Sequence, residues 1–397
     1  MSSISSGTTH AGPDIGVIAL VPERWESISR TTRHNVLQRL ARHFRVVWVE
    51  PPVYWREYRA GAALQAHSRR PFDPAPGLHV LPTDLMSVRI FRPAALARAL
   101  ERRRLRRAAA LLREHGCRRI VLYIWRPEFA SAVDLIPADA VLYHIDDEYT
   151  FSKVDRPVPP AEAALIRRAD RVIVHSQTLL EKKGGINPNT HLIPNGVDFH
   201  AFSTPAPEPA ALRDVPRPRI GYVGVIKQQL NLTLLLDLAR RQPEWSFVFV
   251  GPVGAIGDQA VALSALQKLP NCHFIDRQPP EALPGFVQHM DVCTLPYVVD
   301  GYTRYIYPLK LHEYLAAGRP VVAAPIPALE QFRDVVTTAE TAEQWISGIE
   351  RALAADACSP DAARARRSIA ENHDWDALVR QIAAVVSSAL SRSEPRS

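Results

Sequence analysis

The sequence predicts an α/β protein with two parallel β-sheets, each covered by helices on both faces. Short apolar runs alternate with segments of helical periodicity along nearly the whole chain, which is typical of consecutive βαβ units. A proline-rich stretch at residues 203–217 interrupts the alternation, which then restarts. A chain of 397 residues is long enough for two domains with separate cores. Residues 14–202 and 218–374 are therefore the predicted domains, joined by a linker.

The apolar runs of the first domain are continuous, as expected for strands that are buried on both faces of a sheet. Its expected strands are residues 15–21, 45–50, 120–125, 140–145, 171–176 and 191–193. Its expected helices, in which apolar residues recur at helical spacing, are residues 31–43, 98–119 and 160–169.

The second domain repeats this pattern after the linker. Its expected strands are residues 219–224, 246–251, 272–275, 292–295 and 321–324. Its expected helices are residues 231–241, 259–267, 282–288 and 308–317. Residues 375–397 are expected to form a terminal helix and a polar tail, and the Ser/Thr/Gly-rich residues 1–13 are expected to be disordered.

The composition is that of an ordinary globular protein, with four cysteines far apart in the sequence. The cysteines lack metal-ligand spacing, so they are expected to be packing residues in a reducing compartment. The sequence shows neither a signal peptide nor an apolar run as long as a membrane span. A cytoplasmic location is therefore expected.

The net charge of +7 is unevenly distributed, because arginines are concentrated between Arg98 and Arg119. Leucines among them predict a basic amphipathic helix, which can lie on an anionic membrane surface such as the inner face of the plasma membrane. An equally weighted alternative is a solvated helix in an arginine-rich protein. No nucleic-acid-binding motif accompanies the arginines, so nucleic acid is not an expected partner.

The most informative segment of the second domain begins at Pro308 and Leu309 and ends at Gly318. Proline in a first helical turn costs little, and the free backbone N–H groups of that turn attract anions. Lys310 adds a positive charge suited to a phosphate, and Glu313, one turn later, can accept hydrogen bonds from ribose hydroxyls. The alternative is an ordinary amphipathic helix with a solvated Lys–Glu pair.

This segment resembles the donor-binding motif of GT-B glycosyltransferases, written Pro-Leu-Lys-x-x-Glu-Tyr-x-Ala-x-Gly-x-Pro-Val-Val. The nearest family is family 4 of the retaining enzymes (glycosyl transferases group 1). The resemblance implies two Rossmann-like domains facing each other across a cleft, with a nucleotide diphosphate sugar bound to the second. That family often has two glutamates separated by seven residues. In this chain Tyr305 occupies the position of the first and Glu313 that of the second.

Two further elements of the second domain follow from the same resemblance. The turn from Gly221 to Gly224, with Lys227 after it, matches the turn that holds the donor diphosphate. A tight structural turn with an exposed lysine is the alternative. Tyr297 follows a strand close to the donor in relatives, and other tyrosines near it can either stack on a base or sugar or pack in the core.

In the first domain, Tyr143-His-Ile-Asp-Asp-Glu-Tyr149 covers the end of a predicted strand and the residues after it, where ligands of open α/β sheets bind. A partial resemblance to the xanthan glucuronosyltransferase family places Asp147 as a general base for an inverting transfer. In a retaining enzyme, His144, Asp146 or Asp147 is instead a positioning residue. Aspartates capping a helix are the structural alternative.

Three residues are expected on the acceptor side of the cleft because they recur in this group of enzymes: Arg33, His34 and Arg126. The Pro194-Asn-Gly-Val-Asp198 motif before the linker resembles the signature of the group and is interpreted as a hinge.

The sequence thus predicts a glycosyltransferase that uses a nucleotide-sugar donor and a lipid-linked or other membrane-associated saccharide acceptor. No cofactor or metal is expected, since lysines and helix N-termini can neutralise the leaving diphosphate. Two alternatives are a UDP-sugar epimerase of GT-B fold and a non-catalytic scaffold. The sugar, the acceptor and the stereochemistry of transfer are left open.

Overall fold

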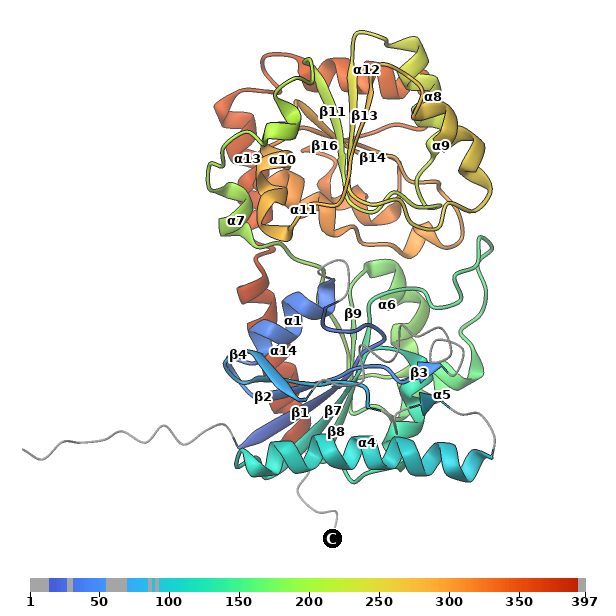
Figure 1. The fold of residues 1–397 in the computed structure, drawn as a ribbon, viewed down its shortest axis with the longest axis vertical. Coiled ribbons are helices and arrows are strands. Elements are labelled where there is room, and N and C mark those ends of the chain that lie inside the picture. Colours follow the sequence, from blue (N-terminus) through green and yellow to red (C-terminus); the bar gives the residue numbers. More distant parts are fainter. Residues whose placement is uncertain (1–13, 27–30, 55–69, 85–87, 90–92, 392–397) are drawn as a thin grey trace, which may run out of the picture.

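A computed structural model of the protein describes residues 14–26, 31–54, 70–84, 88–89 and 93–391. The two sheets form two domains stacked along the long axis of the molecule, as predicted (Figure 1). The expected disorder of residues 1–13 and most of the C-terminal tail lie outside the described residues. No helix in the described part of the chain is long and apolar enough to cross a membrane.

The first sheet has eight strands in the order β10-β9-β8-β7-β1-β2-β5-β4, and only β4 is antiparallel to its neighbour. All six strands predicted for this domain are present to within a few residues. The strands β4 and β5 and a separate two-stranded ladder of β3 and β6 were not predicted. The strands are β1 Ile15–Leu20, β2 Arg45–Val49, β3 Val53–Tyr54, β4 Phe72–Ala75, β5 Leu78–Leu81, β6 Val88–Arg89, β7 Arg119–Ile124, β8 Ala140–Ile145, β9 Arg171–Val174 and β10 Thr190–Leu192.

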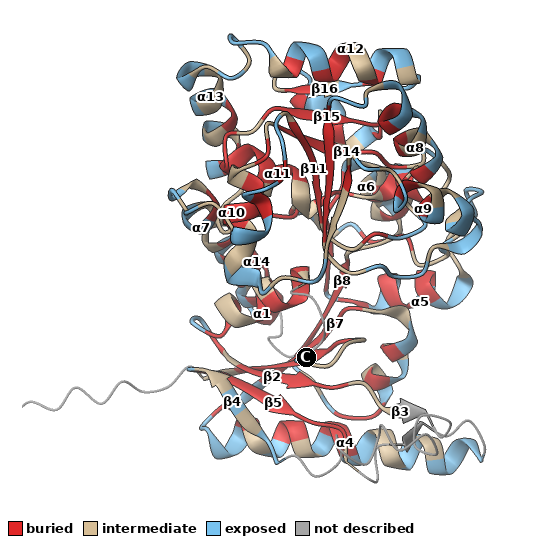
Figure 2. Ribbon diagram, turned by 45° about the horizontal axis from the view of Figure 1, so that its top comes forward, coloured by how far each residue is buried: buried red, intermediate tan, exposed pale blue. Residues whose placement is uncertain are grey.

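Helices cover both faces of this sheet because its strands alternate between two cores. Val17 and Ala19 of β1 belong to the core under α1 and α14, whereas Ile18 and Leu20 belong to the core under α4, α5 and α6. Burial follows this layering, with buried strands between helices whose outer sides are exposed (Figure 2). The helices are α1 Thr32–Leu40, α4 Ala94–Glu114, α5 Pro160–Arg168, α6 Gln177–Lys183 and α14 Trp375–Leu390.

The second sheet has six parallel strands in the order β13-β12-β11-β14-β15-β16 around one core. Its five predicted strands and four predicted helices are present, and β16, α12 and α13 were not predicted. The strands are β11 Arg219–Val223, β12 Ser246–Val250, β13 Cys272–Ile275, β14 Val292–Leu295, β15 Val321–Ala323 and β16 Val336–Thr338. The helices are α8 Leu232–Arg241, α9 Ala260–Leu266, α10 Leu283–Gln288, α11 Leu309–Ala316, α12 Ala342–Leu353 and α13 Pro360–Glu371.

The chain crosses between the domains twice, and backbone hydrogen bonds join the two crossing segments. Val197 N donates to the His373 carbonyl, and Trp375 N donates to the Val197 carbonyl. A Cβ atom at Gly196 would lie 2.6 Å from the His373 oxygen, so this crossing requires glycine. After the second crossing α14 packs against α1 of the first domain. The predicted hinge motif therefore lies at the connection between the domains.

Asn195 and Asp198 of the same motif tie the hinge to both domains. The Asn195 side chain accepts from Thr32 Oγ1 at 3.0 Å and donates to the Tyr307 carbonyl at 2.8 Å. Asp198 caps the short helix α7, Phe199–Ser203, and forms an ion pair with Arg39 of α1.

Candidate functional site

A cleft of roughly 640 Å³ lies between the domains, at the carboxyl ends of β11, β12 and β13. The second domain contributes Gly224, Gly251 and α11, and the hinge region contributes Asp198 and His200. Open α/β sheets bind ligands at this edge of the sheet. Three of the predicted donor residues line the cleft together with Gly224: Leu309, Lys310 and Glu313.

Lys310 lies in the first turn of α11 and crosses the end of β11 at Gly224. A Cβ atom at Gly224 would overlap the Lys310 Cε atom, and Gly224 also has a φ of +147°. Gly251 has a φ of +137°, and its Cβ atom would lie 2.5 Å from the Gly224 carbonyl oxygen. Both turns therefore need glycine, and the absence of side chains there leaves room for the ammonium group.

Glu313 faces the cleft one turn after Lys310 and forms no ion pair with any residue that the structure describes. Burial raises the pKa of its carboxyl, and the Lys310 charge partly counters that rise. The backbone N–H of Val223 donates to the Tyr314 hydroxyl at 2.9 Å, which fixes α11 against β11. A lysine and a glutamate that line a cleft without pairing are available for a polar ligand.

Asp147 of the first domain faces the second domain after β8. The Tyr302 hydroxyl donates to Asp147 Oδ2 at 2.8 Å, and the Glu148 backbone N–H donates to Oδ1 at 2.8 Å. Burial, together with the neighbouring Asp146 charge, raises the pKa of Asp147 to about 6. A carboxyl with such a pKa can take up a proton near neutral pH, which suits a general base.

Lys227 belongs to the electrostatic surroundings of Asp147. Desolvation and the Lys310 charge lower the pKa of Lys227, whereas Asp147 acts in the opposite direction. Lys227 is not among the residues that line the cleft. Its predicted contact with a diphosphate remains a prediction, and its charge interacts with those of Lys310 and Asp147.

Asp146 has different partners from Asp147. Arg33 NH2 lies 2.7 Å from Asp146 Oδ2, and the Tyr149 hydroxyl donates to Oδ1 at 2.8 Å. Arg33 also pairs with Glu23 at 3.0 Å and is 9% exposed. This arrangement makes Arg33 and Asp146 a buried pair that orients the loop after β8, rather than groups free to bind an acceptor.

Two predicted site residues lie inside the first domain. His144 is within β8 and 2% exposed; its Nδ1 lies 2.8 Å from the Tyr123 hydroxyl, and its ring stacks on Trp125. Burial lowers its pKa to about 3. The His34 ring contacts Thr31 and the Trp25 carbonyl, in a capping box at the start of α1. Their placement argues against the predicted roles, because both rings serve internal packing and hydrogen bonding.

The predicted donor residues Gly221, Tyr297 and Pro308 are also absent from the cleft lining. A Cβ atom at Gly221 would overlap the Met290 side chain, so that glycine serves core packing. Tyr297 is 6% exposed within the core of the second domain. Pro308 precedes the first helical residue, as the N-cap of α11, and is not inside the first turn.

The other three tyrosines, for which stacking on a ligand was one of the two predicted roles, are buried as well. Tyr302, Tyr305 and Tyr307 are at most 8% exposed. Tyr305, at the position of the family's first glutamate, donates to Asp155 Oδ2 at 2.8 Å and packs in the first-domain core near Lys182. This position therefore joins the two domains in this chain instead of facing the cleft.

Arg126 is the predicted acceptor-side residue that remains partly exposed. Its guanidinium lies 4.7 Å from the Tyr149 ring centroid and 5.3 Å from that of Phe151. Phe151 and the contact between Tyr302 and Asp147 were not predicted from the sequence. Gln278, which lines the cleft after β13, was not predicted either. Of these unpredicted features, only Gln278 could have been found from the sequence, because it follows a predicted strand.

The basic segment forms α4, as predicted, but its apolar side is used within the protein. Leu105 and Leu112 are buried in the first-domain core, and Arg104 donates to the Glu50 carbonyl at 2.8 Å. Arg102 and Arg106 point outward as exposed residues and form no ion pair with the described residues.

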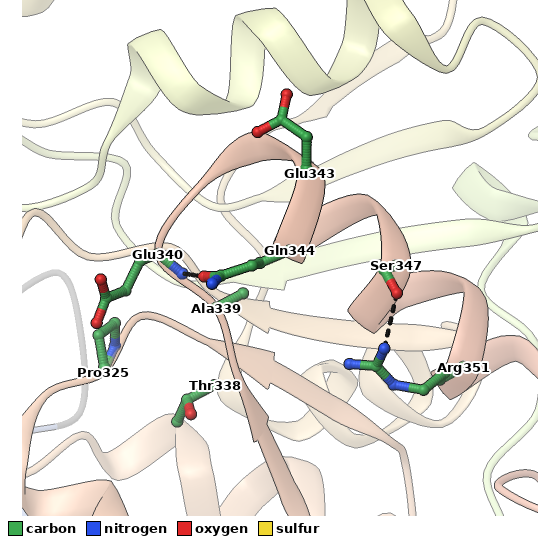
Figure 3. A pocket seen from close by; sticks show the side chains of 8 residues that line it. All are labelled: Pro325, Thr338, Ala339, Glu340, Glu343, Gln344, Ser347 and Arg351. Atoms are coloured by element: carbon green, nitrogen blue, oxygen red, sulfur yellow. Dashed lines mark hydrogen bonds between the residues drawn. The ribbon is translucent and has the colours of Figure 1, made fainter.

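A second hollow of about 560 Å³ lies beside β16 and the start of α12 (Figure 3). Its polar groups bind one another: the Glu340 N–H donates to Gln344 Oε1, and Arg351 donates to Ser347 Oγ. Within the described ranges, no three potential metal-binding side chains are grouped closely enough to hold an ion. The expectation that no metal takes part remains a prediction.

Known proteins resemble this chain in sequence. Residues 217–355, which include the whole second sheet and α11, match the family described as Glycosyl transferases group 1. The chain is 29% identical over 284 residues to TuaH of Bacillus subtilis (strain 168), named as a teichuronic acid biosynthesis glycosyltransferase. That alignment covers 66% of this chain and 71% of TuaH.

Solved structures are similar over almost the whole chain. Anabaena Alr3699/HepE in complex with UDP and glucose has a TM-score of 0.63 at 16% identity, over 95% of this chain and 100% of that one. The catalytic domain of Arabidopsis thaliana Starch Synthase IV, bound to ADP and acarbose, has a TM-score of 0.65 at 13% identity, over 96% and 100%. These structural similarities establish the fold. The matches to the glycosyltransferase family and to TuaH favour a transferase over the epimerase and scaffold alternatives. The chain is a glycosyltransferase with the GT-B fold, and residues 217–355 of its second domain match the glycosyl transferases of group 1.

Proposed function

We propose that this enzyme transfers a sugar from a nucleotide diphosphate sugar to a hydroxyl group of a membrane-associated saccharide during polysaccharide or glycolipid synthesis. The observation that carries the proposal is the placement of Lys310, Glu313 and Gly224 around one interdomain cleft. Lys310 and the N-terminus of α11 favour the diphosphate, whereas Glu313 suits ribose hydroxyls. Asp147 lies on the opposite domain, where it would act on the acceptor hydroxyl or position the donor sugar.

Similar proteins support the donor class. Alr3699/HepE binds UDP and glucose, and Starch Synthase IV binds ADP. The name of TuaH assigns it to teichuronic acid biosynthesis, which supports a role in polysaccharide synthesis for this chain.

A thermal-shift screen of nucleotide sugars tests the donor assignment. A ligand at 100 times its Kd stabilises the protein by about 2.7 kcal/mol. We expect Lys310→Ala and Glu313→Gln to abolish most of the stabilisation, whereas the exposed-site controls Lys268→Ala and Glu350→Gln retain it. Absence of stabilisation by every UDP-, ADP- and GDP-sugar, or equal stabilisation of all four variants, would falsify the donor assignment.

Attachment to the membrane is proposed to occur through the outer face of α4. Since its buried leucines pack on the first sheet, charge rather than insertion would supply the binding energy. Each arginine near an anionic surface contributes about 1 kcal/mol. The exposed arginines of α4 that form no ion pair with another described residue include Arg102, Arg106 and Arg113.

Co-sedimentation with phosphatidylserine-containing vesicles tests this attachment. Replacing the three arginines with glutamine is expected to weaken partitioning by roughly a hundredfold. The matched control replaces three exposed arginines of the second domain, Arg240, Arg333 and Arg364, with glutamine. Equal partitioning of the two triple variants would show that α4 is only a solvated helix.

A further inference from the structure

Phe151 is an exposed aromatic residue with an uncommon backbone conformation, close to Asp147. Its side chain is 49% exposed, and its φ of +48° is the only positive value of a non-glycine residue in the described part of the chain. The left-handed region is unfavourable for bulky residues, and such strain is concentrated at functional sites. Core packing does not account for a ring that is half in solvent.

A buried ion cluster holds the turn that contains Phe151. The Phe151 N–H donates to the Glu148 carbonyl at 3.1 Å, and the Thr150 N–H donates to Glu148 Oε1 at 3.3 Å. Lys183, which is fully buried, lies 3.2 Å from Glu148 Oε2 and 2.7 Å from Glu162 Oε1. The backbone of Phe151 is therefore fixed by groups behind it, and the ring is presented in one position.

The Phe151 ring forms a continuous surface with Tyr302 and Arg126. The ring centroids of Phe151 and Tyr302 are 5.6 Å apart, and Tyr302 is the residue that donates to Asp147. The Arg126 guanidinium stands over both Phe151 and Tyr149. This surface begins at the candidate base and extends to the exposed side of the first domain.

Arg126 retains free donors at this surface. Its Nε lies 3.4 Å from Glu128 Oε2, a weak contact, and its terminal nitrogens have no hydrogen-bond partner among the residues described. A planar guanidinium with free nitrogens binds carboxylate and phosphate groups in a bidentate manner. Its stacking on two aromatic rings restricts its orientation.

We propose that Phe151 and Arg126 form an acceptor subsite for an anionic saccharide, a proposal that rests on the proposed function. Phe151 covers the apolar face of a sugar ring, and Arg126 binds a carboxylate or phosphate carried by that sugar. The acceptor hydroxyl then lies toward Asp147, beyond Tyr302. The subsite thus selects an acidic or phosphorylated acceptor over a neutral one.

Saturation-transfer difference NMR on the full-length protein tests the subsite with three probes: methyl β-glucuronoside, glucose 1-phosphate and neutral methyl β-glucoside. At least one anionic probe is expected to bind roughly tenfold or more tightly than the neutral one, since charge-assisted hydrogen bonds contribute about 1.5–3 kcal/mol. The better of the two anions distinguishes a uronic-acid acceptor from a phosphorylated one. Arg126→Gln is expected to remove the preference, whereas Arg167→Gln, at an exposed site on α5, retains it.

Phe151→Asn removes the aromatic ring without disturbing the fold, because asparagine tolerates a positive φ and keeps the turn. This variant is expected to melt at or above the wild-type temperature and to lose saccharide binding at least tenfold. Val154→Asn, at a 70% exposed position of the same loop, is the control that retains binding. Equal binding of the neutral and anionic probes, no binding of any probe, or full binding by Phe151→Asn would overturn the subsite. In those cases nucleotide-sugar stabilisation shows that the proposed function stands, and its absence shows that both proposals fail.

Discussion

Replacing Asp147 with asparagine tests two things separately: how much the buried carboxylate lowers the stability of the protein, and whether that carboxylate takes part in catalysis. The folded-state pKa of about 6 lies above the ordinary value of 3.8, because burial and Asp146 disfavour the charged form. The folded protein therefore binds more protons than the unfolded chain between about pH 4 and pH 6, so this group lowers stability as pH rises through that interval. Above pH 6 the loss is complete.

The magnitude follows from the pKa difference. One pH unit corresponds to about 1.4 kcal/mol, so a carboxyl with a pKa of about 6 instead of 3.8 costs at most about 3 kcal/mol above pH 6. The amide oxygen of asparagine can still accept from the Glu148 N–H, and its NH2 group can donate to the Tyr302 hydroxyl, which accepts as well as donates. Asp147→Asn is thus expected to stabilise the protein by about 1–3 kcal/mol at pH 8 and by nearly nothing at pH 4.

Urea unfolding of the wild type and the variant across pH 4–8, followed by circular dichroism, measures this difference. Asp146→Asn is the matched control with the opposite expectation, because it removes a partner of the buried Arg33 and should destabilise by about 3 kcal/mol. A constant difference across pH, or an Asp147→Asn variant less stable than wild type at pH 8, would refute the reasoning. If Asp147 is the general base, the variant should also lose roughly 10²–10⁴-fold in turnover.

Three further predictions concern the surroundings of the cleft. Gly224→Ala would force Lys310 aside, so this variant is expected to lose thermal stabilisation by nucleotide sugars. The control Gly185→Ala, where a Cβ atom meets nothing within 4 Å, is expected to keep that stabilisation. Lys183→Met leaves the buried Glu162 without its cation and leaves Glu148 only Lys182, at 3.5 Å. Urea unfolding should therefore show a loss of about 3–5 kcal/mol, and a loss under 1 kcal/mol would contradict the buried-cluster account. Tyr302→Phe removes a hydrogen bond that lowers the pKa of Asp147, so the acidic limb of the pH–rate profile should move to higher pH; an unmoved limb means that Asp147 does not control it.

The βα alternation and the linker were sufficient to predict the fold, because burial in a parallel sheet requires continuous apolar runs at strand length. The predicted strand at residues 140–145 agrees with β8, and this boundary already placed His144 inside a strand and Asp147 beyond its end. The strands β4 and β5 were missed because their sequences, Phe-Asp-Pro-Ala and Leu-His-Val-Leu, are short and interrupted by polar residues or proline.

The local sequence also determined which residues begin α11, and Lys310 and Glu313 do line a cleft. It could not show that Gly221 packs on Met290 while Gly224 makes room for Lys310, since both glycines belong to one short motif. Their difference arises from what each one faces after the sheet and helices have packed.

Only the tertiary structure decided the partners of the two neighbouring aspartates. Asp146 meets Arg33, which is 113 residues away in the chain, and Asp147 meets Tyr302, which is 155 residues away on the other domain. Adjacent residues after a strand point in different directions, so one becomes part of a buried ion pair and the other faces the second domain. Hydrophobic periodicity specifies the strands and helices locally, whereas contacts between distant side chains depend on how the two domains are placed against each other.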